Sequence, residues 1–292
     1  MFYEAKGDSV QIARMYMDSL LVESRIVGAV KPDSAFRFLG ETFSMPIMTA
    51  ALSHLDLVSM AEGARQAGAC VSIGMGGNEE MGRVLSTGAK VMKIIKPYAE
   101  EKEILDRIAY AEENGALAVG MDVEHAVNVD DAEDSVVVGL QMKQPTLAEL
   151  EKYIRSTKLP FFIKGALSAR DAVRCRDLGA AGVILSHHNG LMRWAVPPVM
   201  ILPEVRRAVG NDLILIADGG IESGFDAFKA LSRGADAVTM GKALMRPLKE
   251  NGPEGVRETL RKACGQLQAM MIRTGTKDLK HMDPSVIHET LR

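Results

Sequence analysis

The stretch "LILIADGGIESGFDAFKALSRGADAVTMGK" (213–242) contains two nearly continuous apolar runs with a helical pattern between them. The first run closes on Gly219 and Gly220, and the second closes on Gly241. Apolar runs without alternation are typical of parallel β-strands that are covered on both faces. The stretch therefore predicts a strand, a helix and a second strand that lies parallel to the first.

The same rhythm of a short apolar run followed by a helical stretch extends back to residue 46. Eight runs are predicted to be strands: 46–52, 70–75, 90–96, 117–124, 160–166, 181–187, 213–220 and 235–242. A closed (β/α)8 TIM barrel requires eight units of this kind, so we predict an α/β fold with this barrel. An open doubly wound sheet has a similar rhythm, but no G-x-G-x-x-G turn follows the first run.

The barrel is predicted to form a single domain. Residues 1–45 are expected to be a short N-terminal leader packed on the barrel, and residues 46–292 are expected to hold the barrel and its C-terminal helices. Asn78 and Ser168 each precede a helical stretch and are predicted to be N-caps, because side chains of these types accept hydrogen bonds from the first helical amides.

The composition excludes several classes of partner. The chain has 292 residues, of which 47% are hydrophobic and 25% charged, and its formal net charge of −3 gives no reason to expect nucleic acid or an anionic membrane as partner. Three scattered cysteines form no disulfide framework, which favours a reducing cytosol. No stretch approaches the roughly 20 apolar residues of a membrane span. We therefore predict a cytoplasmic protein that acts on a small-molecule substrate.

Polar and ionisable residues close several of the predicted strands. They are Asp122, Glu124 and His125, then Lys164, then Ser186, His187 and His188, then Asp218, and finally Lys242. Functional residues of a TIM barrel gather at the C-terminal ends of its strands. Because buried ionisable groups are costly unless they are paired or used, this repeated placement predicts one shared site.

The last two predicted strands also carry a pattern that suits a phosphate group. Gly219, Gly220 and Gly241 allow backbone N–H groups to approach a ligand closely. The helix that follows each strand would add a favourable dipole. The loops after the last two strands are the usual phosphate seat of this barrel, so a phosphate-bearing ligand is predicted there.

Two long stretches carry a resemblance to a known family: "FFIKGALSARDAVRCRDLGAAGVILSHHNG" (161–190) and "IADGGIESGFDAFKALSRGADAVTMGK" (216–242). They resemble the FMN-dependent α-hydroxy-acid oxidases and dehydrogenases, to which glycolate oxidase and flavin-linked L-lactate dehydrogenase belong. The resemblance covers 160–245 and, with "FLGETFSMPIMTA" (38–50), extends over 36–98. It implies the same barrel, FMN as cofactor and a homo-oligomer, namely a tetramer.

The resemblance also implies roles for individual residues. His188 matches the base that removes a substrate proton, Asp122 the carboxylate that orients this base, and Lys164 the cation near the flavin. His188 and Arg193 are the predicted substrate-binding residues. The predicted cofactor-binding residues are Ala50, Ala51, Lys93, Lys164, Ser186, Asp218, Gly219, Gly220, Gly241 and Lys242.

The chain departs from the family pattern at positions that bear on substrate and cofactor. The arginine that grips the substrate carboxylate is replaced by Leu191, with Arg193 as a candidate substitute, and a substrate-binding tyrosine is replaced by Ile95. These changes argue against glycolate and lactate as substrates. The phosphate-binding arginine after the Gly-Gly pair is replaced by Glu222, which would repel a phosphate if it pointed at it, whereas Lys93 would add a cation near the flavin.

Three functions remain open at this point. The first is an FMN-dependent oxidoreductase that oxidises a 2-hydroxy acid or a related hydroxyl-bearing substrate. The others are an FMN-dependent isomerase and a barrel that has lost FMN and binds another phosphorylated ligand. His187 is expected to be solvated, and no metal is expected, although His54, His125 and His188 all follow strands.

Overall fold

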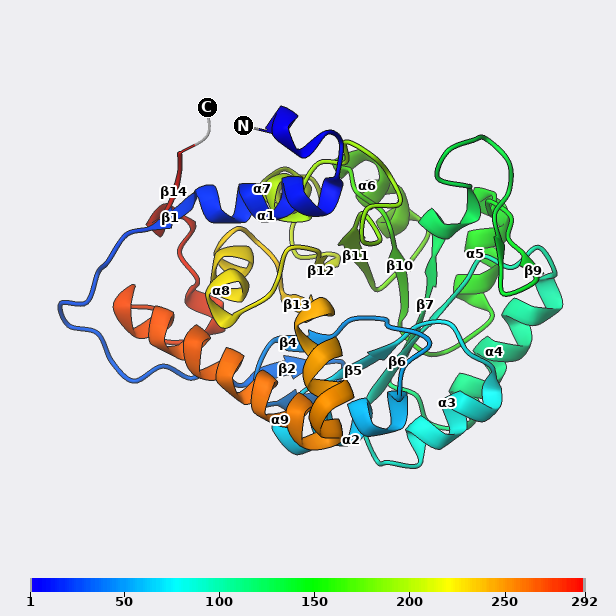
Figure 1. The fold of residues 1–292 in the computed structure, drawn as a ribbon, viewed down its shortest axis with the longest axis horizontal. Coiled ribbons are helices and arrows are strands. Elements are labelled where there is room, and N and C mark those ends of the chain that lie inside the picture. The colour runs from blue at the N-terminus through cyan, green and yellow to red at the C-terminus, as the bar shows by residue number, and fades with distance from the viewer. Residues whose placement is uncertain (1, 291–292) are drawn as a thin grey trace.

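The computed structural model describes residues 2–290, and an eight-stranded parallel sheet is its centre (Figure 1). Its strands are β4 (Ile47–Thr49), β5 (Val71–Ile73), β6 (Val91–Ile95), β7 (Ala118–Asp122), β10 (Phe161–Lys164), β11 (Gly182–Ser186), β12 (Ile214–Asp218) and β13 (Ala237–Met240). Every strand lies inside a predicted run. The order across the sheet is β4-β13-β12-β11-β10-β7-β6-β5.

The two ends of this order meet, so the sheet is closed. The backbone N–H of Thr49 on β4 donates to the carbonyl of Cys70 at 3.3 Å, and the Thr49 hydroxyl oxygen accepts from the Ser72 N–H at 2.8 Å. A parallel bridge joins Leu52 to Ile73 just beyond. The predicted (β/α)8 TIM barrel is therefore confirmed.

Helices surround the strands, as Figure 1 shows. They are α2 (Leu57–Ala67), α3 (Asn78–Leu85), α4 (Glu101–Glu113), α5 (Leu147–Arg155), α6 (Ala169–Asp177), α7 (Pro198–Val209), α8 (Gly224–Ser232) and α9 (Lys242–Arg273). Each buries apolar side chains. In α4, for example, Ile104, Ile108 and Ala111 are buried at three- and four-residue spacing. None of the helices between residues 2 and 290 is both long and apolar enough to cross a membrane.

Local capping signals account for most helix starts. The Ser168 hydroxyl accepts a hydrogen bond from the Asp171 N–H at 3.0 Å, which confirms Ser168 as an N-cap. The prediction for Asn78 was wrong, because the helical bonds begin one residue earlier. The carbonyl of the extended residue Gly77 accepts from the Met81 N–H at 3.1 Å, so Gly77 is the N-cap and Asn78 the first helical residue.

An aromatic hairpin packs against the apolar residues inside the barrel. Strands β2 (Phe36–Phe38) and β3 (Glu41–Phe43) pair antiparallel, and the Phe38 ring lies 6.0 Å from the ring of Phe162 on β10. All three phenylalanines of this hairpin belong to the same buried cluster as Met92, Ile94 and Ile184. The ionisable strand ends lie beyond this cluster, at the C-terminal ends of β7, β10, β11 and β12.

The N-terminal residues pack on the rim of that open end. They form η1 (Phe2–Ala5), α1 (Ser9–Ser19) and β1 (Leu20–Val22), which pairs with β14 (Ile287–Glu289) after η3 (Leu279–His281) and η4 (Pro284–Val286). The Ser9 hydroxyl donates to the carbonyl of Met192 at 2.5 Å and accepts from the Ala195 N–H at 2.9 Å. Helix α1 is thereby fastened to the loop after β11.

A second small hairpin rises from the loop after β7. This loop begins with η2 (Val123–Ala126) and continues into β8 (Val136–Val137) and β9 (Leu140–Gln141), which pair antiparallel. The bridges Val127–Asp134 and Tyr98–Met142 tie the loop to itself and to the loop after β6.

Candidate active site

The ends of β7, β10 and β11 bring the three predicted catalytic residues together. The Asp122 Oδ2 atom lies 2.6 Å from His188 Nδ1 and 3.3 Å from Lys164 Nζ. Strand register explains the second contact, because Lys164 is the direct partner of Asp122 across β10 and β7. Asp122 is 1% exposed, so these contacts are made away from solvent.

A strained turn aims His188 at this cluster. His188 has φ of 43° and Asn189 has φ of 56°, a left-handed conformation that is uncommon for residues with a side chain. The His188 N–H donates to the Ser186 hydroxyl at 3.0 Å, which fixes the turn. Such strain persists only where the surroundings enforce it, and it is concentrated at functional sites.

Mutual attraction keeps Asp122 and Lys164 charged despite their burial. Burial by itself would raise the pKa of Asp122, but the ammonium groups of Lys164 and Lys96 hold this pKa well below its usual range. Burial would likewise lower the pKa of Lys164, but the carboxylates of Asp122 and Asp218 raise it above its usual value. The cluster is therefore a network of fixed charges at neutral pH.

His188, by contrast, is kept neutral. Burial and then the Lys164 cation lower the pKa of His188, although Asp122 opposes them. Because the Asp122 carboxylate can only accept a hydrogen bond, the His188 proton sits on Nδ1 and leaves the lone pair of Nε2 free. A neutral imidazole held by a carboxylate in this tautomer can accept a proton.

Sequence reasoning missed Lys96 and the place of His125. The Lys96 Nζ atom lies 2.9 Å from Asp122 Oδ2 and 2.9 Å from His125 Nδ1. His125 Nδ1 is in turn 3.2 Å from His188 Nε2, with the two rings edge to face at 4.5 Å. Burial, followed by the Lys96 cation, lowers the pKa of His125 to about 4. Alternation along β6 could have found Lys96, since Met92 and Ile94 face the barrel interior and Lys96 continues that row.

The charged cluster has the spacing of a metal site but already holds cations. Ligand atoms of Asp122, His125 and His188 lie within 4.8 Å of one another, whereas His54 takes no part. The ammonium groups of Lys96 and Lys164 both contact Asp122 Oδ2, one of these ligand atoms. A divalent ion would have to displace them, which favours an ion-pair network over a metal centre.

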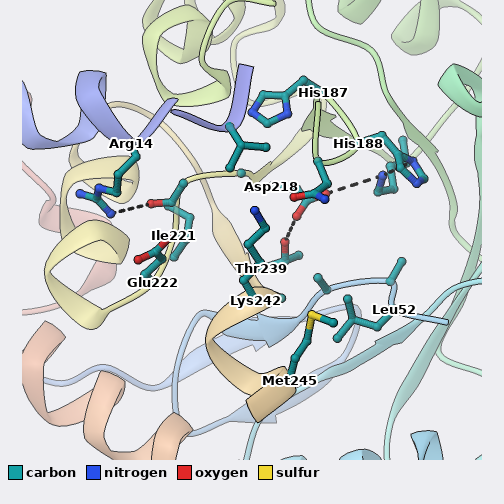
Figure 2. A pocket seen from close by; sticks show the side chains of 18 residues that line it. Arg14, Leu52, His187, His188, Asp218, Ile221, Glu222, Thr239, Lys242 and Met245 are labelled. Carbon is teal, nitrogen blue, oxygen red and sulfur yellow. Dashed lines mark hydrogen bonds and ion pairs between the residues drawn. The ribbon is translucent and has the colours of Figure 1, made fainter. Parts of the chain in front are cut away.

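Beside the cluster lies a cavity of about 350 Å³ that most of the predicted cofactor residues border (Figure 2). Those residues are Ala50, Ala51, Lys164, Asp218, Gly219, Gly220, Gly241 and Lys242. Asp218 is held by hydrogen bonds from the Ser186 hydroxyl at 2.8 Å and the Thr239 hydroxyl at 2.6 Å. Ser186 thus acts on the wall of the cavity through Asp218 and is not itself part of the lining.

The glycines of this wall leave space that side chains would fill. A Cβ atom at Gly241 would lie 3.2 Å from the Ala50 Cβ, and one at Gly219 would lie 3.2 Å from His187 Nε2. A cavity of this volume, with backbone amides at the start of a helix and a buried cation on its side, fits a phosphate-bearing aromatic cofactor such as FMN.

The structure does not bring Lys93 to the cavity. Side chains alternate along β6, so Lys93 points away from the interior row of Met92 and Ile94. Its Nζ donates to the carbonyls of Gly74 at 2.5 Å and Gly76 at 3.1 Å, and burial lowers its pKa to about 8. Lys93 therefore supports the loop after β5, and the expectation of a flavin contact is corrected.

Arg193 and His187 also differ from expectation. The Arg193 side chain is 66% exposed, does not border the cavity, and lies 4.0 Å from Asp130 on the neighbouring loop. His187 was expected to be solvated, yet it is 2% exposed and borders the cavity. His188 and Asn189, which follow it, have positive φ angles, so the chain turns sharply directly after His187.

Glu222 also borders the cavity. It is exposed at the rim of the cavity, and its backbone N–H donates to Asp226 Oδ2 at 3.1 Å. Arg14 of α1 lies at the same end of the cavity, as Figure 2 shows. Sequence reasoning missed Arg14, because nothing in residues 1–45 indicates that α1 reaches this rim.

Comparison with known proteins shows the family of the chain. The family model for FMN-dependent dehydrogenases matches residues 5–138 and 125–289. The chain belongs to this family. The predicted resemblance to the FMN-dependent α-hydroxy-acid oxidases and dehydrogenases is thus confirmed, and FMN is the cofactor of the family.

Members of this family with known activity align over different shares of their length. An L-lactate oxidase of Roseobacter sp. (strain GAI101) is 35% identical over 158 residues, which is 54% of this chain and 43% of that protein. Glycolate oxidase 3 of Arabidopsis thaliana is 26% identical over 94% of this chain and 86% of its own length. The alignment with the Roseobacter protein, like that with an L-lactate oxidase of Alicycliphilus denitrificans at 38% identity, thus spans 43% of the length of the relative.

A solved structure shows the same fold. Mandelate oxidase with (S)-2-phenylpropionate superposes with a TM-score of 0.85 over 98% of this chain and 90% of that chain, at 24% identity. At this identity the superposition is evidence for the barrel alone.

Proposed function

We propose that this member of the FMN-dependent dehydrogenase family oxidises the hydroxyl-bearing carbon of a 2-hydroxy acid or a related compound. The observation that carries the proposal is the contact of His188 and Lys164 with one buried carboxylate, Asp122, at the edge of the cavity. When bound, FMN supplies the acceptor for the hydride that leaves this carbon. The hydroxyl oxygen loses a proton, and the product is the corresponding carbonyl compound.

His188 is the proposed base. It is neutral at pH 7, because burial lowers its pKa, and its Nδ1–H is held by Asp122 at 2.6 Å. The proton from the substrate would arrive at Nε2 and give an imidazolium that Asp122 stabilises. Nε2 lies 3.2 Å from His125 Nδ1, so the protonated ring would compete with the Lys96 ammonium for this acceptor.

Lys164 is the proposed electrostatic support. Its ammonium borders the cavity and lies 3.7 Å from Asp218 and 3.3 Å from Asp122, which together fix its position. A fixed cation in a site with little water favours negative charge that develops beside it during reaction.

The substrate differs from glycolate and lactate in this proposal. Leu191 cannot pair with a carboxylate, the buried Ile95 does not border the cavity, and Arg193 is exposed outside it.

Anaerobic spectroscopy tests the proposal. The purified chain is loaded with FMN and mixed with a panel of hydroxy acids, and loss of the flavin absorbance is followed. We expect at least one compound to bleach the wild type and His188→Asn to bleach about 10²- to 10⁴-fold more slowly. His281→Asn, at an exposed histidine of η3, is the matched control.

Two results would overturn this function in favour of the alternatives. Conversion of a substrate with no bleaching of bound flavin would support an isomerase. A chain that ignores FMN but binds another phosphorylated compound would support a barrel that has lost the cofactor. The expected homotetramer and the cytosolic location are proposals too, and light scattering on the purified chain tests the first.

A further inference from the structure

We propose that Arg14 and His187 bind the phosphate group of FMN in this chain. They would take over the role of the family's phosphate-binding arginine, whose position is occupied here by Glu222. The inference rests on the FMN-binding part of the proposed function. It assigns a ligand-binding role to α1, which lies outside the barrel strands and their helices, and to a histidine that no catalytic step uses.

Arg14 reaches the glycine loop from α1. Its Nη1 donates to the carbonyl of Gly220 at 3.1 Å, while Nη2 contacts Asp226 at 2.9 Å and Asp18 at 2.6 Å. A guanidinium has five N–H donors, so two remain after these three bonds. Arg14 borders the cavity, so an oxyanion there could accept from the two remaining donors.

The carboxylates around Arg14 hold its guanidinium group in place and neutralise its positive charge only in part. Asp226 is buried and paired with Arg14, so it holds the guanidinium against the loop. Asp18 and Glu222 are exposed, and water screens their charges. The Lys229 ammonium, which donates to the carbonyl of Met17 at 2.8 Å, is a further cation on this side.

Two further features favour an anion at this end of the cavity. Lys242 borders it as the first residue of α9, and the N-terminal amides of this helix have no partner within the helix. The helix dipole adds to the attraction. Arg14 would therefore complete a phosphate-binding site that also contains Lys242 and the N-terminus of α9.

His187 is the second, independent observation. Its Nδ1 accepts a hydrogen bond from the Gly190 N–H at 3.1 Å, so its proton sits on Nε2. That Nε2–H is buried and has no acceptor among residues 2–290. It lies next to Gly219, because a Cβ there would come within 3.2 Å of Nε2.

A buried N–H without an acceptor is costly, and a ligand oxygen would remove that cost. Burial lowers the pKa of His187, so the ring is a neutral donor at pH 7. Its position beside Gly219, with Arg14 beside Gly220, places the two donors along the same glycine loop.

A purely structural role would also explain Arg14, because its bond to Gly220 fastens α1 to the barrel. The two roles differ in their dependence on the ligand. A fastening role would change the affinity for FMN and for riboflavin alike. Recognition of the phosphate changes the affinity for FMN alone, since riboflavin lacks that group.

The test compares FMN with riboflavin by quenching of flavin fluorescence on the apo-protein. Arg14→Gln is expected to weaken FMN binding about 10- to 100-fold and to leave riboflavin binding within about twofold, as befits loss of a charge-assisted hydrogen bond. His187→Ala is expected to weaken FMN binding about 5- to 10-fold. His187→Gln, which keeps a donor at a similar place, should recover most of that loss.

Arg25→Gln is the matched control, because Arg25 pairs with Glu23 and Asp283 away from the cavity. Urea unfolding of each variant verifies that it folds. The inference is overturned if Arg14→Gln binds FMN as tightly as the wild type, or if it loses FMN and riboflavin equally. A wild type that binds neither flavin overturns the proposed function itself, and this inference with it.

Discussion

The two halves of the barrel mouth are built on opposite principles. The half at the ends of β6, β7, β10 and β11 is made of side chains, with two ammonium groups and an imidazole on the single carboxylate of Asp122. At the ends of β12 and β13 the cavity wall is formed largely by backbone, because Gly219, Gly220 and Gly241 have no side chains. We call this part the glycine half, and the other the charged half.

This difference predicts that substitutions in the two halves have different effects. In the charged half each group compensates the burial of another, so removal of one leaves the others with uncompensated charge. In the glycine half Gly219, Gly220 and Gly241 have no side-chain partner to lose, so an added side chain removes room for a ligand while the fold persists. Stability should therefore respond in the first half and binding in the second.

The largest effect is expected from Asp122→Asn. The amide cannot balance the buried ammonium groups of Lys96 and Lys164, and breaking such a network costs about 3–5 kcal/mol. Urea unfolding at pH 7 measures the loss. Any oxidation of substrate should also fall by orders of magnitude, because His188 loses the carboxylate that sets its tautomer.

Asp218→Asn is the matched control in the glycine half. Asp218 accepts from the hydroxyls of Ser186 and Thr239, and its nearest cation, Lys164, is 3.7 Å away. An amide oxygen can accept one of these bonds, so a loss of only about 1–2 kcal/mol is expected. Equal losses in the two variants would contradict the contrast between the halves.

The second prediction concerns the pH dependence of stability through Glu124. Burial raises the pKa of Glu124 from its ordinary value of 4.5 to about 8. Between these two values the unfolded chain has ionised while the folded chain still holds the proton, so this residue lowers stability as pH rises. Relative to wild type, Glu124→Gln should gain about 1 kcal/mol per pH unit between pH 5.5 and 7.5.

Urea unfolding at several pH values measures this difference. Glu79→Gln, at an exposed carboxylate on α3, is the control and should follow the wild type at every pH. A constant offset between Glu124→Gln and wild type across this range would show that Glu124 ionises normally in the folded protein.

Local signals made the strands and the two glycine turns predictable. Each apolar run was bounded by glycine, proline or charged residues, so all eight observed strands fall inside the predicted ranges. Asp122, Lys164 and His188 were found because charged residues at the ends of apolar strands are rare without a purpose. Their contact through one oxygen atom depends on strand register, which spacing alone does not give.

The missed residues depend on features that the sequence encodes only weakly. Lys93 was assigned by resemblance, whereas alternation along β6 turns it away and brings Lys96 inward. His187 is buried, and two residues with positive φ follow it, which the sequence did not indicate. Arg14 reaches the cavity only because α1 folds across the rim, and this is a long-range packing event that no local pattern signals.

The third prediction addresses the glycine half through Gly241→Ala. Gly241 has φ of −112°, which is not the left-handed region that favours glycine, so the added methyl tests mainly volume. Its Cβ would lie 3.2 Å from the Ala50 Cβ and narrow the cavity. FMN affinity is expected to fall about tenfold, which corresponds to ~1.4 kcal/mol, with unfolding within about 1 kcal/mol of wild type.

Gly265→Ala is the control, because a Cβ atom there meets nothing within 4 Å and the residue lies in α9 away from the cavity. This variant should bind FMN as the wild type does and be slightly more stable, since alanine favours a helix. If Gly241→Ala unfolds at a lower urea concentration than the wild type but binds FMN with the same affinity, Gly241 is needed for stability and not for FMN binding.

The smallest effect is expected from Arg193→Ala, because Arg193 lies outside the charged half. Arg193 lies only seven residues beyond the last strand residue of β11, but its side chain is exposed and its nearest carboxylate, Asp130, is 4.0 Å away. An exposed pair at this distance contributes about 0–1 kcal/mol, so stability should change by less than about 0.5 kcal/mol.

For a hydroxy acid that the wild type oxidises, KM should change by less than about twofold, because in this structure the guanidinium does not border the cavity. A tenfold rise in KM with unchanged kcat would mean that the loop after β11 folds inward around the substrate, and the charged half would then extend to Arg193 in the working enzyme.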